Sequence, residues 1–283
     1  MQPEEFTLDI AGVTLAGKRW RNGSRPVLAL HGWLDNAATF DFLAPLLDAD
    51  IVAIDLAGHG HSHHRPLQAA YNIWDDLPDI LRVADALGWA QFNLLGHSRG
   101  AIIATLLTAV FPERITSSVM LDGLIPDTRP DSEFLDQLAL HLREHLAPAG
   151  PVTFYPSVEK ALHARCIASG MTEISARPIV ERGLLRTEDG WIWRSDRRLR
   201  LPSAMRLSDA HIDAIVTRLV DKKHLLLLAT SDAKHSQVRR ERMKQTPRLN
   251  WQDVSGGHHF HLEEGVATIA EKINEFWSES LSD

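Results

Sequence analysis

The segment at residues 92–110, "FNLLGHSRGAIIATLLTAV", constrains the fold more than any other part of the chain. Gly96, Ser98 and Gly100 lie between two apolar runs. A glycine–x–serine–x–glycine pattern alone is weak, since a chain of this size contains one by chance about one time in ten. The flanks make it specific, because they predict a strand, a tight turn and a helix. In that geometry the serine hydroxyl lies at the carboxyl edge of a sheet, in a strained backbone conformation for which the two glycines leave room.

The rest of the chain alternates between the patterns of strands and helices. Residues 6–20 predict a hairpin that turns at Ala11–Gly12. Buried strands are expected at 26–32, 51–60, 91–96, 115–123 and 224–232 and in "RLNWQDVSGG", and helices at 75–87, 101–110 and 265–277. This alternation predicts an α/β fold, with a mostly parallel sheet and helices on both faces.

The alternation stops after the sixth strand. Candidate helices follow at 131–147, 156–169, 175–186 and 208–221, interrupted by the tryptophan-rich stretch "EDGWIWRSD". We therefore expect a core made of residues 1–125 and 222–283, with a helical cap inserted at 126–221. Trp191 and Trp193 alternate as on a strand, so one is expected to face a pocket or both to pack in the core.

Composition excludes several classes of function. The chain has 30 Lys and Arg residues and 37 Asp and Glu residues, which gives a net charge of −7. It has no block of basic residues, so a nucleic-acid partner is not expected. No apolar run approaches the ~18 residues of a membrane span. The start, "MQPEEFTLDI", lacks the pattern of a secretion signal, and the single cysteine, Cys166, cannot form an internal disulfide. These features predict a cytoplasmic protein in which Cys166 is a packed or half-buried thiol.

Ser98 is the candidate nucleophile. The helix that follows it offers free amides and a partial positive charge, which favour a nearby anion. A serine hydroxyl needs a base, and in this order of elements an acid and then a histidine should follow it in the chain. Among 15 histidines, His258 in "SGGHHFHLEEG" is the candidate base, because it follows the last strand and two glycines. His259 is the fallback, and a solvated cluster or a metal site is the alternative for this stretch.

An oxyanion formed by attack on a carbonyl needs two backbone donors already in place. The amide of Arg99, directly after the nucleophile, is one candidate. The amide of Trp33, in "LHGWLDN" after the first long buried strand, is the other, with His31 and Gly32 shaping that turn. The Arg99 side chain lies in the first turn of a helix, where a cation opposes the dipole. We expect its guanidinium to pair with a carboxylate or to face an anionic part of the substrate, unless it is simply solvated.

With these motifs in this order, the chain resembles an α/β-hydrolase, and within that superfamily it resembles the serine hydrolase-like group. The resemblance rests on "HGWLDNAATFD", "IDLAGHGHS", "LLGHSRG", "MLDG" and "GGHHFHLE", taken in order, and on the cap segment "ERGLLRTEDGWIWRSDRRLR". It implies a hydrolase core, a helical cap over the active site and no cofactor. It also implies a triad acid at Asp232, since "ATSD" has the spacing at which relatives carry theirs. The alternative acid is Asp122, at the end of "SSVMLD".

Four positions depart from the pattern of these relatives. Arg99 stands where an uncharged residue is frequent, Ala101 replaces a second glycine, Ala57 replaces an arginine and Ala229 replaces a glycine. None of them removes a reacting group, but each affects the shape of the pocket.

The run "GHGHSHH" raises a metal hypothesis. Imidazoles are common zinc and copper ligands, and His59, His61, His63 and His64 lie close together in the chain. The same run is a loop element of the resembled family, and adjacent flexible residues seldom give a defined coordination geometry. No metal is therefore expected.

The expected function is that of a serine hydrolase, a carboxylic ester hydrolase for a small or medium acyl substrate. Lactonase, amidase, C–C hydrolase and perhydrolase chemistry would use the same triad, so they stay open. A ligand receptor of this fold with slow turnover is the alternative from another class. The sequence does not specify the substrate or the oligomeric state.

Overall fold

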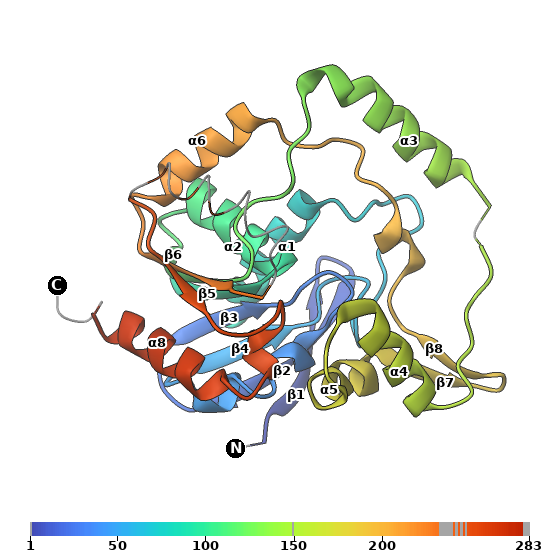
Figure 1. Ribbon diagram of the computed structural model, residues 1–283, viewed down its shortest axis with the longest axis horizontal. Coiled ribbons are helices and arrows are strands. Elements are labelled where there is room, and N and C mark those ends of the chain that lie inside the picture. Colours follow the sequence, from blue (N-terminus) through green and yellow to red (C-terminus); the bar gives the residue numbers. More distant parts are fainter. Residues whose placement is uncertain are drawn as a thin grey trace.

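The computed structural model of the protein describes residues 2–148, 150–231, 240, 243, 246 and 248–279. Its centre is an eight-stranded sheet in the order β1-β2-β4-β3-β5-β6-β9-β10 (Figure 1). The strands are β1 (Glu4–Ile10), β2 (Val13–Arg21), β3 (Pro26–Leu30), β4 (Asp50–Ile54), β5 (Phe92–His97), β6 (Ile115–Leu121), β9 (His224–Ala229) and β10 (Trp251–Val254).

The sheet is parallel from β4 to β10, and β2 joins it as an antiparallel strand that carries β1 at the edge. The hairpin predicted around Ala11–Gly12 is present, and Ala11 and Gly12 both have positive φ. The predicted fold class, an α/β-hydrolase fold, is confirmed. Because parallel strands end at the same edge, the segments that follow β3, β5, β6 and β9 converge there.

Helices cover both faces of the sheet, and those that pack on it are α1 (Asp76–Ala86), α2 (Arg99–Val110), α6 (Asp209–Leu219) and α8 (Val266–Ser278). Three further helices, α3 (Phe134–Leu146), α4 (Val158–Ser169) and α5 (Glu173–Gly183), lie outside these clusters. Alternation along β3 shows how the core is divided. Val27 and Ala29 pack in the cluster that holds α8, whereas Leu28 and Leu30 pack in the one that holds α1 and α2.

The segment between β6 and β9 carries α3 to α6 and a separate hairpin, β7 (Leu184–Thr187) and β8 (Gly190–Trp193). The helix expected at 175–186 ends at Gly183, and the chain continues as β7, whose Leu184 pairs with Trp193 of β8. Trp193 also packs closely on Gly183, where a Cβ would lie 3.0 Å from its ring. Trp191 and Trp193 both pack against the buried cluster of α4 and α5.

The last helix of this segment, α6, belongs to the sheet. Its Ile212, Val216 and Leu219 pack with Leu226 of β9 in one buried cluster. The part of the segment that stands away from the sheet therefore ends before α6 (Figure 1). Within the described ranges, no helix has both the length and the apolar character needed to cross a bilayer.

Candidate active site

Ser98 occupies the turn between β5 and α2. Its φ of 51° and ψ of −111° lie outside the ordinary regions for a residue with a side chain. The turn is tight enough that a Cβ at Gly96 would lie 2.3 Å from the Gly100 carbonyl oxygen, and one at Gly100 only 1.9 Å from that of Leu30. The Ser98 amide donates to the Leu121 carbonyl at 2.9 Å. These contacts hold the predicted strand–turn–helix geometry and leave Ser98 partly exposed.

His258 follows β10 and the two glycines at 256 and 257. Its Nδ1 lies 2.5 Å from Oδ2 of Asp122. The imidazole is partly exposed, at 34%, whereas the Asp122 side chain is 2% exposed. Because Nδ1 bonds the carboxylate, Nε2 is the nitrogen that can act as a base toward a nucleophile.

Asp122 directly follows β6, with a φ of 45°. Its Oδ1 accepts a hydrogen bond of 3.0 Å from the Ala229 amide, so the carboxylate connects the end of β9 with His258. The next residue, Gly123, packs on the Ser98 backbone, where a Cβ would come 2.5 Å from the Ser98 carbonyl oxygen. The structure thus brings the alternative acid, Asp122, to His258. Asp232, the acid expected first, lies outside the described residues.

The loop after β3 carries Trp33, one of the two expected oxyanion donors, and two buried histidines shape it. His31 donates through Nδ1 to the Gly32 carbonyl at 2.7 Å and accepts from the Leu56 amide at 2.9 Å. His59 accepts from the amide of Leu34, whose φ is 60°. Burial lowers the pKa of His31, and lowers that of His59 well below the usual range. Both rings therefore act as neutral hydrogen-bonding groups.

Arg99, the other expected oxyanion donor, is the first residue of α2, so its amide precedes the intrahelical bonds. Its guanidinium donates to Asp76 of α1 at 2.6 Å, and both side chains are largely buried. The expectation that Arg99 pairs with a carboxylate is confirmed. The Asp76 carboxylate on α1 thereby offsets the unfavourable interaction of the Arg99 cation with the dipole of α2.

A second polar cluster lies directly behind the triad candidates. It consists of Asp35, His97, His259 and Arg165, and Asp35 Oδ2 lies 3.2 Å from His259 Nε2 and 3.6 Å from His97 Nδ1. Arg165, on α4, bonds the other carboxylate oxygen. Burial alone would raise the pKa of Asp35, but His259, His97 and Arg165 together hold it well below its usual range. Burial lowers the pKa of His97 to about 4.

This cluster contains the described group that best matches a metal site. Ligand atoms of Asp35, His97 and His259 lie within 4.8 Å of one another. Nδ1 of His97 is buried without a hydrogen bond, while its Nε2 bonds the His258 carbonyl at 3.0 Å. The Arg165 guanidinium already places a positive charge on the only carboxylate of the group, which opposes a divalent cation. We describe the cluster as an ion-pair network.

The histidine run of the metal hypothesis is spread over separate contacts. His59 holds the loop after β3, and the backbone amide of His61 donates to Asp55 at 2.8 Å. His64 bonds the Arg194 carbonyl through Nε2 at 2.8 Å, and His63 is exposed. The metal-like grouping found among the described residues includes none of these four.

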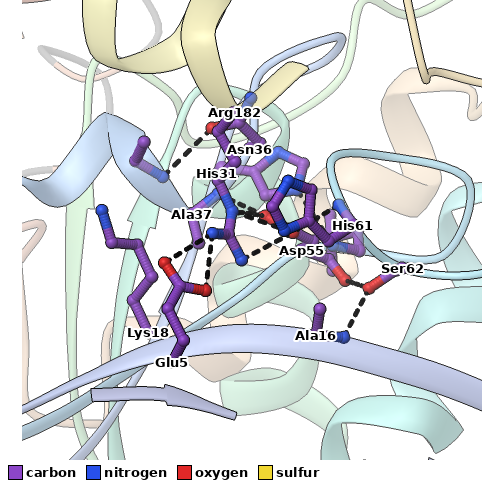
Figure 2. Close-up of polar contacts among 12 residues, drawn as sticks. Glu5, Ala16, Lys18, His31, Asn36, Ala37, Asp55, His61, Ser62 and Arg182 are labelled. Carbon is purple, nitrogen blue, oxygen red and sulfur yellow. Dashed lines mark hydrogen bonds and ion pairs between the residues drawn. The ribbon is translucent and has the colours of Figure 1, made fainter. Parts of the chain in front are cut away.

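Figure 2 shows a further buried carboxylate, Asp55, at the end of β4. It accepts from the amides of Ala37 and His61 at 2.7 and 2.8 Å and from Arg182 Nε at 3.0 Å. Arg182, on α5, also bonds Glu5 of β1 at 2.8 Å. Asp55 thereby connects α5 with the sheet beneath the loop that carries Trp33.

The sequence analysis missed Asp35, Asp55, Arg165 and Arg182. Both aspartates lie in segments that it singled out, and an acidic residue just past a buried strand is a visible signal. The arginines carry none, because each finds its carboxylate 130 or 127 residues away in the chain.

Comparisons with known proteins agree with this architecture. A family profile described as the alpha/beta hydrolase fold matches residues 25–148. The chain is similar to a serine hydrolase-like protein of Dictyostelium discoideum, at 30% identity over 98% of this chain and 82% of that protein. It is similar to a serine hydrolase-like protein of Danio rerio at 31% identity, over 94% and 86%. The crystal structure of a hypothetical protein of Pseudomonas aeruginosa matches at a TM-score of 0.91 and 37% identity, over 100% of both chains.

Proposed function

The chain belongs to the serine hydrolase-like proteins of the α/β-hydrolase fold, and on this premise we propose that it cleaves a small or medium acyl ester. Ser98 is the nucleophile, His258 the base and Asp122 the acid. The observation that carries the proposal is the 2.5 Å contact between His258 and Asp122 beside the strained turn of Ser98. Backbone strain at two neighbouring strand ends is typical of functional sites.

The proposed reaction passes through an acyl-enzyme. His258 Nε2 takes the proton of the Ser98 hydroxyl as its oxygen attacks the ester carbonyl, and Asp122 stabilises the resulting imidazolium. The amides of Trp33 and Arg99 bind the oxyanion. When the intermediate collapses, the C–O bond to the alcohol breaks and the imidazolium protonates the leaving oxygen. Water, deprotonated by His258, then releases the acid and restores Ser98.

The choice of Asp122 over Asp232 rests on geometry. A triad acid has to hold Nδ1 of the histidine, and Asp122 does so while the Ala229 amide fixes its other oxygen. Asp122 directly follows β6 and has a positive φ, and this backbone conformation directs its carboxylate along the sheet edge toward His258.

We also propose that the cap expected at residues 126–221 limits substrate size, and that it comprises only residues 126–207, because α6 packs on β9. This segment emerges at the carboxyl edge of the sheet, where α/β enzymes bind their ligands. Three side chains of the loop after β3 bond it: Trp33 Nε1 donates to the Leu199 carbonyl at 2.9 Å, Asn36 Nδ2 to that of Ile179 at 2.8 Å, and Asp35 pairs with Arg165. The cap thus contacts the loop that supplies an oxyanion amide.

The decisive experiment combines a fluorophosphonate label with a panel of activated esters of increasing acyl length. The wild-type protein should take up one label on Ser98, release alcohol in a burst and favour short to medium chains. Ser98→Ala should lose the label and roughly 10⁶-fold in turnover. Ser132→Ala, an exposed serine of the cap, is the control.

Two outcomes would overturn the proposal. Labelling of Ser98→Ala at another serine with full activity would move the nucleophile. Folded wild-type protein that gives neither label nor burst would favour the slow receptor of this fold.

A further inference from the structure

The helix α3 stands apart from the rest of the fold. Figure 1 shows it beyond the sheet, and the short 3-10 helix Asp131–Glu133 directly precedes it. None of its 13 residues is buried. An isolated helix shorter than about 12–15 residues is marginal in water, so α3 needs packing from elsewhere to be stable.

One side of α3 touches its own chain. Gln137 Nε2 donates to the Ser203 carbonyl at 2.5 Å, and Nδ1 of His141, one turn later, bonds the Pro202 carbonyl at 2.8 Å. These two bonds orient the helix. No residue of α3 is buried, and its other faces carry half-buried side chains such as Leu138 and exposed ones.

A second side carries a leucine stripe, formed by Leu135, Leu138, Leu142 and Leu146. The spacing of three, four and four residues places these side chains on one face. Leu135 is 72% exposed, Leu142 49% and Leu146 81%. A contiguous apolar face of this kind marks an interaction site.

The charges beside the leucine stripe indicate what covers it. Asp136 lies near its start and Arg143 near its end, and seven residues, about two turns, separate them, so both flank the stripe on the same side. When two copies of α3 pack antiparallel through their stripes, Asp136 of each faces Arg143 of the other. The helix dipoles are also opposed in this arrangement, which is favourable. The surface is therefore complementary to itself, as a two-fold symmetric interface requires.

The same charges disfavour a lipid surface. Residues 131–146 contain four acidic residues and a single basic one. The acidic residues are Asp131, Glu133, Asp136 and Glu144, and the basic residue is Arg143. Amphipathic helices that bind membranes are rich in Lys and Arg on the polar face. We propose that α3 is a dimerisation helix, whose leucine stripe packs antiparallel against the leucine stripe of a second copy of this chain.

The expected dimer is weak. A contact limited to two helices of this length lies below the ~1,200 Å² of a standard stable interface. Its population should therefore depend on protein concentration in the micromolar to millimolar range.

Sedimentation velocity over that range tests the proposal. Wild-type protein should shift from monomer to dimer, and Leu142→Glu should raise the dissociation constant by ~100-fold, because each dimer loses two buried leucines and gains two carboxylates. Leu140→Glu is the matched control: it lies on the same helix and is 43% exposed, but it points away from the stripe. It should dimerise as the wild type does.

A charge exchange tests the antiparallel orientation. Asp136→Arg and Arg143→Asp should each weaken self-association, because like charges then face one another. An equimolar mixture of the two variants should associate more tightly than either alone.

Wild-type protein that stays monomeric throughout, or dimers that Leu142→Glu leaves unchanged, would overturn the proposal. So would binding of the monomer to anionic lipid vesicles that Leu142→Glu abolishes, because the stripe would then be a membrane surface. Far-ultraviolet circular dichroism of every variant confirms that the fold is retained.

Discussion

Two residues with positive φ meet at the candidate active site, Ser98 after β5 and Asp122 after β6. Each breaks the direction of its strand, so that the side chain projects from the sheet edge instead of lying on a face. Such a conformation costs of order 1–3 kcal/mol and persists only where the surroundings fix it. Here Gly123 packs on the Ser98 backbone and the Asp122 amide bonds the Leu227 carbonyl at 2.8 Å. The two strained residues are thus the proposed nucleophile and the proposed acid.

Replacing Asp122 by asparagine tests the proposed acid. The amide oxygen can still accept from Ala229, but the charge that stabilises the His258 imidazolium is lost. We expect kcat on an activated ester to fall by about 10⁴ with the thermal midpoint nearly unchanged. Asp232→Asn is the comparison and should retain its rate. The reverse result, a collapse in Asp232→Asn alone, would return the acid to the position that the family resemblance favours.

His97 makes the stability of the protein depend on pH. Its folded-state pKa of about 4 lies below the ordinary 6.5, so the unfolded chain takes up this proton first as the pH falls. The contribution is complete above pH 6.5 and is lost between 6.5 and about 4, with a slope of up to about 1.4 kcal/mol per pH unit. Urea unfolding at several pH values should show a slope to which His97 contributes together with His31 and His59, whose pKa values burial also lowers. His97→Gln should reduce this slope. An exposed-site control, His63→Asn, should keep it, and an equal slope in His97→Gln would refute the assignment.

At the scale of elements, local patterns were enough to predict most of the fold. The strands and helices of the core were predicted within a few residues, and the family resemblance drawn from the motifs is confirmed by the relatives. The exceptions have a non-local cause. Past Gly183 the chain leaves α5 to pair with Trp193 in the β7–β8 hairpin, and the pairing of Arg165 with Asp35 joins residues 130 positions apart. The pairing of His258 with Asp122 is also non-local, because it depends on how the ends of β6, β9 and β10 meet in space. The spacing of residues along the chain does not determine this arrangement.

The pairing of α4 with the loop after β3 has a measurable energy. Arg165 and Asp35 are 15% and 2% exposed, so removing the guanidinium leaves Oδ1 of a buried carboxylate without its arginine, with His259 still beside Oδ2. Arg165→Met should destabilise the fold by about 3 kcal/mol, and Asp35→Asn in the same chain should recover part of it. Arg177→Met on α5 is the control, since its pair with Glu181 is exposed and worth well under 1 kcal/mol. Equal losses in both variants, measured by urea unfolding, would contradict the coupling.

At the scale of the whole molecule, burial is distributed unevenly. The central strand β5 is buried at every position, whereas α3 is buried at none. Between them, α4 buries Ala161 and Leu162 against α5 and holds the core through Arg165. The molecule therefore combines a buried sheet, which carries the proposed triad at its edge, with a proposed cap whose outermost helix buries none of its residues.

Amide hydrogen exchange should resolve this gradient and its dependence on concentration. Amides of β5 exchange only through global unfolding, because each lies in the centre of the sheet, while those of α3 exchange through local opening at almost no cost in free energy. In dilute protein α3 should be the first helix to exchange, followed by α4. Above the dissociation constant of the proposed dimer, α3 alone should gain protection, since binding stabilises only the segment that it orders. The Leu142→Glu protein should show the dilute pattern at every concentration. Strong protection of α3 in dilute protein would mean that contacts within one chain already stabilise the helix. That result would contradict both the uneven burial described above and the proposed role of the dimer.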